Sequence, residues 1–192
     1  MRRTRVFGGL VAVALGALLI GALTGGFAPA PGRASGPFAW LKPASAPRGW
    51  HLARTGAGAT LAYPPGWTPI KTDPGTASVA LLRGDRIDGY LNATPRQGTE
   101  TLADWSHFRL HHNQGEGDRD ERLVAATPDG RFRSGRGACV IDTYSTSKTT
   151  YREIACLVSS ARSSAVVVAA APRSEFERQA GTLERAVSSF AP

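Results

Sequence analysis

The side chains best suited to chemistry lie together near the middle of the chain. Asp104, His107 and His111 follow one another at helical spacing, so on a helix all three would share one face. Two imidazoles and a carboxylate are ligands that zinc or copper accepts. A polar, solvated helix face is the alternative, and the adjacent His112 favours it. Because no HExxH motif or fourth ligand accompanies these weak candidates, the sequence predicts no metal and no other cofactor.

Motifs of nucleophilic catalysis and nucleotide binding are missing from the sequence. It contains no GxSxG, no P-loop and no GxGxxG, and the serine pairs 159–160 and 163–164 have no adjacent histidine. Several acidic residues have a spacing typical of solvated turns: Asp85, Asp88, Asp118, Asp120 and Glu121. We therefore expect that the protein is not an enzyme, with a cryptic hydrolase as the least favoured alternative.

Cys139 and Cys156 are the two cysteines of the chain. In an exported protein two cysteines usually pair, so we expect a disulfide between them. A hairpin with its tip at residues 147–148 would set these cysteines directly opposite each other. The same register would also place Asp142 opposite Glu153, which is unfavourable for two carboxylates. A slipped or bulged register is therefore the alternative.

Two helices can be predicted from hydrophobic periodicity. The first spans residues 101–114, where Thr101 caps the helix with Asp104 three residues on, and its apolar stripe contains Leu102, Trp105 and Phe108. The second covers about 174–187, with Ser174 and Glu177 as a capping box. Its apolar stripe consists of Phe176, Ala180, Leu183 and Val187.

Short β-strands account for most of the remaining domain. The expected ranges are 50–54, 60–63, 67–71, 79–83, 89–94, 122–126, 132–133, 138–144, 151–158 and 165–171. The last of these is apolar without alternation, which indicates a strand buried on both faces. Such a strand needs material above and below the sheet. We therefore expect an α+β fold in which a mostly antiparallel sheet lies between helices.

The net charge of +8 is concentrated before the predicted domain. Six basic residues and no acidic ones precede Gly49, whereas 17 basic and 15 acidic residues follow from there onward. The folded part is therefore nearly neutral. The cluster Arg131, Arg133 and Arg136 is interpreted as surface charge, and we expect no nucleic-acid partner.

Residues 1–28 have the pattern of a membrane-inserting segment. Three arginines precede the uncharged stretch 6–28, which is long enough as a helix to cross a hydrocarbon core of about 30 Å. The arginines should stay inside, so the domain would lie outside the cytoplasmic membrane. A retained single-pass anchor is favoured over a cleaved signal peptide, because proline follows both small-residue cleavage motifs.

A Pro- and Ala-rich linker is expected over residues 29–48, followed by one domain over 49–192. The linker composition cannot bury a core. Phe38 and Trp40 interrupt it, and two placements are open for them: the lipid headgroup level, or the surface of the domain.

Three segments resemble the PsbP-like superfamily: 63–67 (YPPGW), 101–105 (TLADW) and 184–190 (ERAVSSF). This superfamily includes the PsbP subunit of photosystem II, Ran-binding Mog proteins and LpqN/LpqT-type envelope proteins of actinobacteria. The resemblance covers residues 50–190 and implies an α/β/α sandwich that serves as a binding or assembly module, generally without catalysis. The chain differs from the lipoprotein members because it has no lipidation cysteine near the end of the apolar run.

Together these features predict a membrane-tethered binding module of the cell envelope. Its partner would be an unknown envelope protein. The alternative is a carrier for a small apolar or lipid-like ligand held between sheet and helix.

Overall fold

The computed structural model describes residues 36–96 and 98–192. The membrane helix expected over residues 1–28, and the first part of the expected linker, lie outside the described residues. Neither helix of the described part is long and apolar enough to cross a membrane.

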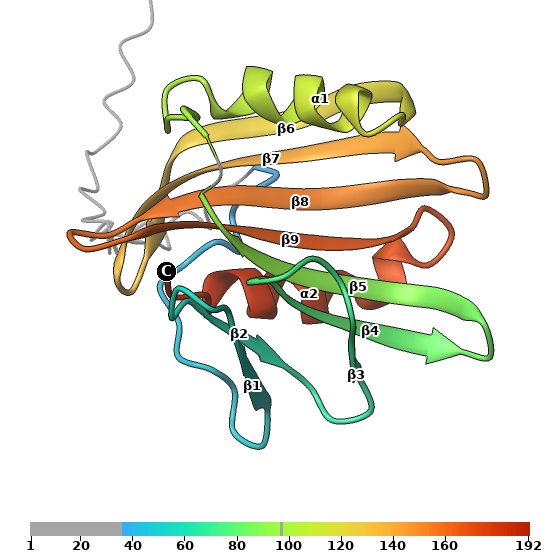
Figure 1. Cartoon of the computed structure of the whole chain (residues 1–192), viewed down its shortest axis with the longest axis horizontal. Coiled ribbons are helices and arrows are strands. Elements are labelled where there is room, and N and C mark those ends of the chain that lie inside the picture. Colours follow the sequence, from blue (N-terminus) through green and yellow to red (C-terminus); the bar gives the residue numbers. More distant parts are fainter. Residues whose placement is uncertain (1–35, 97) are drawn as a thin grey trace, which may run out of the picture. The chain divides into compact units, whose positions relative to one another are not determined.

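A seven-stranded sheet, antiparallel throughout, forms the centre of the domain (Figure 1). Its strand order is β3-β4-β5-β9-β8-β7-β6. The strands are β3 (Thr68–Ile70), β4 (Ala77–Arg83), β5 (Arg86–Pro95), β6 (Arg119–Phe132), β7 (Gly135–Ser145), β8 (Thr150–Ser159) and β9 (Ser164–Pro172). A separate hairpin joins β1 (His51–Arg54) to β2 (Thr60–Tyr63).

Two helices cover opposite faces of this sheet, as the sequence predicts. Helix α1 (Trp105–Gly115) packs mainly on β6, β7 and β8, whereas α2 (Phe176–Ser188) packs mainly on β9. Each face has its own apolar cluster, one around Trp105 and a larger one around Leu183. We call these two sides the α1 face and the α2 face.

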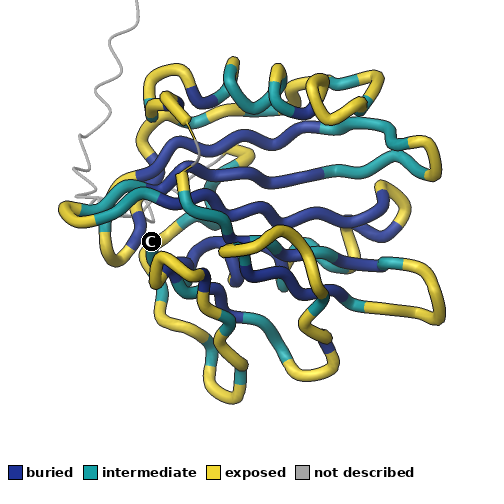
Figure 2. Tube along the Cα trace, in the orientation of Figure 1, coloured by how far each residue is buried: buried dark blue, intermediate teal, exposed yellow. Residues whose placement is uncertain are grey.

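Strand β9 is buried on both faces, in agreement with its uninterrupted apolar sequence (Figure 2). Val166 and Val168 belong to the cluster on the α1 face, and Val167 and Ala169 to the cluster on the α2 face. Since alternate side chains of a strand point to opposite sides, this single strand connects the two cores.

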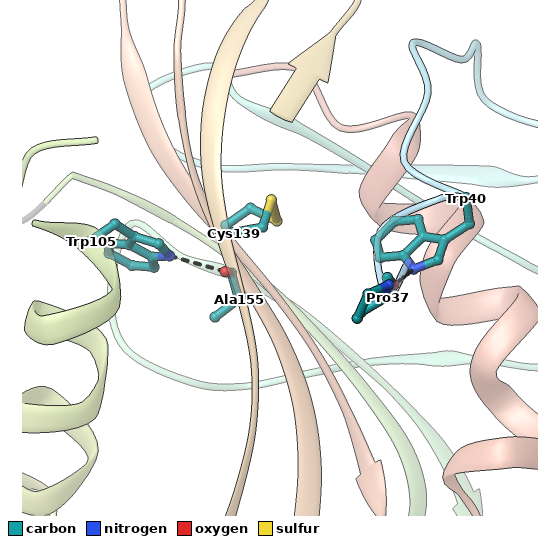
Figure 3. The surroundings of a disulfide bond; sticks show 6 residues. Pro37, Trp40, Trp105, Cys139 and Ala155 are labelled. Atoms are coloured by element: carbon teal, nitrogen blue, oxygen red, sulfur yellow. Dashed lines mark hydrogen bonds between the residues drawn. A yellow bond between two sulfur atoms is a disulfide. The ribbon is translucent and has the colours of Figure 1, made fainter. Parts of the chain in front are cut away.

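The disulfide between Cys139 and Cys156 is present, and these residues are direct cross-strand partners in the β7–β8 hairpin. The register continues without a shift, so Asp142 does lie opposite Glu153. The slipped or bulged alternative is therefore wrong for this hairpin. The disulfide lies on the α2 face, on the opposite side of the sheet from Trp105 (Figure 3).

The segment from residue 36 to residue 50 is part of the domain. Phe38, Trp40, Leu41 and Trp50 pack against the larger apolar cluster. The indole Nε1 of Trp40 donates to the carbonyl of Pro37 at 2.8 Å, which closes a tight turn (Figure 3). Of the two placements open for Phe38 and Trp40, the structure therefore shows docking on the domain.

The YPPGW segment is a turn that positions one tryptophan. Gly66 has a φ of 87°, a left-handed conformation that favours glycine, and Trp67 then lies buried against Gly89 of β5. A Cβ on Gly89 would stand 2.6 Å from the Trp67 ring, so the two residues require each other.

Three local predictions need correction. Glu177 does not form a capping box with Ser174, because α2 begins at Phe176 after Glu175 and the Glu177 carboxylate bonds to Arg152 instead. Helix α1 begins at Trp105, although the expected reciprocal bonds between Thr101 and Asp104 do form one turn earlier.

The third correction concerns β6, for which two short strands were expected. It is one strand of 14 residues with three register shifts against β7. At each bulge β6 contains an extra residue without a partner in β7, so the strand continues although its apolar and polar residues do not alternate regularly.

Candidate functional site

Helix α1 is held on the sheet at its first turn by Trp105. This side chain is 1% exposed, and its Nε1 donates to the carbonyl of Ala155 in β8 at 3.0 Å (Figure 3). The Phe108 ring stacks on Trp105 with 5.8 Å between ring centroids. The apolar stripe predicted from the sequence therefore fixes the start of the helix.

The contact between α1 and the sheet changes from apolar to polar along the helix. Beneath its first turn lie Val140 and Ala155, whereas two strand positions further on β7 and β8 present Asp142 and Glu153 to the same face. The helix matches this change, because Arg109 occupies the position four residues after Trp105.

Arg109 forms a buried ion pair with Glu153. Its Nε and Nη2 both lie 2.7 Å from the same carboxylate oxygen, Oε1. Oε2 of Glu153 is buried and has no hydrogen-bond partner among the described residues. The same holds for both carboxylate oxygens of Asp142, and both acidic residues are 0% exposed. One guanidinium therefore faces two buried carboxyl groups.

Burial governs the protonation of this cluster. The pKa of Asp142 is raised from 3.8 to about 8, first by burial and then by the adjacent Glu153, while Arg109 partly opposes both. Burial by itself would lower the pKa of Arg109, but the charge of Glu153 and its hydrogen bond more than reverse this. At neutral pH the neutral acid is therefore favoured at Asp142, beside a permanently charged arginine.

The far end of α1 adds two acidic residues. Asn113 Nδ2 donates to Glu121 Oε1 at 2.8 Å. The pKa of Glu121 is raised to about 7, mainly by burial and against the opposing effect of the bond from Asn113. The pKa of Asp118 is raised by burial and then by Glu153.

A cleft of about 280 Å³ opens beside this cluster. Helix α1 packs mainly on β6, β7 and β8, so the part of the α1 face formed by β5 and β9 is left largely without a covering helix (Figure 1). The cleft is lined by Asp73, Thr76, Tyr90, Asn92, Thr94, Glu100, Trp105, Phe108, Arg109, His112, Asn113, Glu116, Asp118, Tyr144, Glu153, Val166 and Val168.

The predicted metal candidates lie away from this cleft. His107 and His111 are exposed, with 4.4 Å between their ring centroids, so the helix does bring them together. The Asp104 carboxylate accepts hydrogen bonds from the backbone and hydroxyl of Thr101, which hold its pKa below the usual range. Within residues 36–96 and 98–192, no three His, Cys, Asp or Glu side chains are grouped so as to hold a metal ion.

Two of the acidic residues interpreted as solvated turn charges are not solvated. Asp88 is buried and lies 2.7 Å from Nε of both Arg83 and Arg86. Glu121 is half-buried against α1, as described above. The serines of the two pairs bond to one another across the β8–β9 turn, for example Ser159 to Ser164 at 2.8 Å.

The Arg109–Glu153–Asp142 cluster was not predicted from the sequence, although two signals pointed to it. The hairpin register already placed two carboxylates opposite each other in strands that are otherwise apolar. Arg109 follows Trp105 by four residues, which puts a guanidinium on the buried stripe of the predicted helix.

The comparisons with known proteins identify the fold. No protein-family model and no curated protein sequence matches the chain. The solution structure of cyanobacterial PsbP (CyanoP) from Synechocystis sp. PCC 6803 is similar to it, with a TM-score of 0.55, 14% sequence identity, and coverage of 74% of this chain and 92% of that one. A crystal structure of a Pseudomonas aeruginosa protein of unknown function gives a TM-score of 0.50 at 12% identity, covering 74% of this chain and 96% of that one.

The fold of this chain is therefore PsbP-like, as the three sequence segments had indicated. At these identities the likeness concerns the arrangement of sheet and helices and carries no ligand with it.

Proposed function

We propose that this protein is a non-catalytic binding or assembly module of the cell envelope, tethered to the cytoplasmic membrane by its N-terminal segment, and that it binds its partner through the cleft on the α1 face. The observation that carries this proposal is the incomplete cover of that face. A helix, a hairpin and residues 38–50 cover the apolar cluster of the α2 face, whereas the α1 face keeps an open, polar hollow directly beside its buried cluster. Open concave sites with a few placed polar groups are typical of binding surfaces.

The basic surface at the end of the domain nearest residue 36 supports the proposed membrane tether. Leu41 lies against Gly130, and Arg133 Nη1 donates to Ser45, so the described chain begins beside the β6–β7 turn. The exposed basic residues at this end of the sheet are Lys42, Arg96, Arg131, Arg133, Arg136 and Arg162. Such a cluster suits an anionic headgroup surface, at about 1 kcal/mol per residue close to the membrane.

The chemistry around the cleft fits binding better than catalysis. Asp142 could act as an acid at neutral pH, but it is fully buried and does not line the cleft. Glu153 does line it, with one oxygen occupied by both nitrogens of Arg109. Both cysteines are joined in the disulfide and offer no thiolate nucleophile.

A carrier of an apolar ligand is supported less well by this cleft. Its lining contains five carboxylates and an arginine, and its volume is close to the lower end of the range of about 300–1,000 Å³ usual for drug-sized ligands. Native mass spectrometry of the freshly purified full chain would detect a bound lipid if the carrier alternative holds.

Site-specific photo-crosslinking in intact cells tests the proposal. A photo-reactive amino acid at Asn92, in the cleft, is compared with one at Arg178, which is exposed on α2. We expect a defined crosslinked band from position 92 in the membrane fraction, and a much weaker one from position 178. Equal crosslinking from both positions, or a full-length product in the cytosol with free thiols, would contradict the proposal.

A further inference from the structure

We infer that the α1-face cleft recognises an organic cation, a guanidinium or primary ammonium group. This inference rests on the proposed binding role of the cleft and assigns the chemical class of its ligand.

The cleft concentrates negative charge in a domain that is nearly neutral. Five of the 15 acidic residues of the chain line it, against Arg109 and His112 as the basic or titratable nitrogen side chains of the lining. The five are Asp73, Glu100, Glu116, Asp118 and Glu153. A concave site lined by one sign of charge attracts ligands of the other sign.

The inner wall of the cleft presents an acceptor that needs a donor. Glu153 is 0% exposed, and its Oε2 has no hydrogen-bond partner among the described residues. Arg109 does not supply this donor, because both of its bonding nitrogens contact Oε1. A buried carboxylate oxygen with few donors is costly, and an N–H group that enters the cleft would add a donor and reduce that cost.

Aromatic and amide groups complete a surface suited to a cation. The rings of Phe108 and His112 stack in the wall, with 5.9 Å between centroids. A cationic group over such rings gains attraction from their π faces. Across the cleft, Asn92 donates through Nδ2 to Ser78 Oγ at 2.7 Å, which orients its amide.

The arrangement suits an organic cation better than a metal ion. In the part of the chain that the structure describes, no three acidic, histidine or cysteine side chains converge closely enough to ligate a metal. The carboxylates instead surround a hollow of about 280 Å³, which accommodates the end of an arginine or lysine side chain. Guanidinium donors are spread over a plane and match carboxylates placed in this way.

Calorimetric titration of the full chain in a non-ionic detergent tests the inference. The probe is N-acetyl-arginine amide, and its neutral isostere N-acetyl-citrulline amide is the matched ligand control. We expect the arginine compound to bind at least tenfold more tightly. Equal affinities would overturn the inference, as would Zn²⁺ that displaces the arginine compound at a lower concentration.

Variants at the exposed rim avoid the risk that a core change prevents folding. Asp73→Asn with Glu116→Gln removes two exposed cleft charges, and Asp85→Asn with Asp129→Asn removes two exposed charges elsewhere. We expect the first pair to weaken arginine binding at least fivefold and the second to change it less than twofold. Unchanged binding in the first pair would overturn the assignment to this cleft.

Two further comparisons complete the test. One identifies the source of the cation, and the other distinguishes a failure of this inference from a failure of the proposed function. Agmatine is compared with a short peptide that contains one internal arginine: tighter binding of the peptide assigns a protein partner, and tighter binding of agmatine a small amine. Crosslinking from position 92 without charge discrimination would overturn this inference alone. If the arginine probe shows no preference and position 92 gives no crosslink, the proposed function is overturned as well.

Discussion

The two faces of the sheet are built from the same strands but differ in their use of alternate residues. On the α2 face, positions such as Cys139, Ile141 and Val167 continue the apolar pattern along the strands, and α2 and residues 38–50 pack over them. On the α1 face the apolar pattern stops after Val140 and gives way to Asp142. The comparison suggests that the α2 face supplies most of the stability, while the α1 face retains polar groups at an energetic cost.

The largest expected effect comes from shortening a side chain on each face. Leu183→Ala, at a fully buried position of α2, should lower the free energy of unfolding by about 3–5 kcal/mol, since it leaves a cavity in the larger core. Phe108→Ala removes a half-buried ring of α1 and should cost about half as much. Urea unfolding followed by circular dichroism measures both, and equal losses would mean that the faces contribute alike.

Removing the disulfide should affect stability and leave the cleft intact. Cys139→Ala with Cys156→Ala removes a link between residues 17 apart and should cost about 3 kcal/mol. Because the disulfide lies on the α2 face, binding of the arginine probe at a temperature where the variant is folded should stay within twofold of the original. A larger change in binding would show that the two faces are coupled through β7 and β8.

An effect that depends on pH, and vanishes in acid, is expected from Asp142→Asn. The raised pKa of Asp142 means that the folded chain holds a proton which the unfolded chain loses between about pH 4 and pH 8, so stability falls as pH rises through this window. Asparagine cannot ionise. The variant should therefore become progressively more stable than the original protein as pH rises from 4 to 8, with little difference below pH 4.

The charged groups around Asp142 determine how the Asp142→Asn experiment must be controlled. Glu153, Arg109, Glu121 and Asp118 act electrostatically on Asp142 and still titrate or carry charge in the variant, so only the difference between the two proteins is interpreted. Asp129→Asn, at an exposed residue paired with Arg136, should show no such pH dependence. A difference between Asp142→Asn and the original protein that is independent of pH would contradict the assigned burial effect.

The features that could be predicted from the sequence are those with a local pattern. The uninterrupted apolar run of β9 indicated burial on both faces, and the hairpin register of Cys139 and Cys156 was correct. The capping box of α2 was wrong, because the Glu177 carboxylate bonds to Arg152, a side chain 25 residues away. Local propensity could not anticipate that competition.

By itself the sequence determined the layers, because the period of apolar residues fixes which face of each strand and helix is buried. It also determined the pairing of the two cysteines, since they occupy facing positions of one hairpin. Only the tertiary structure decided that Arg109 meets Glu153, 44 residues further along the chain, and that α1 leaves a cleft beside them. The charge state of a carboxyl group depends on its burial and on its neighbours in space, and these exist only once distant segments have packed together.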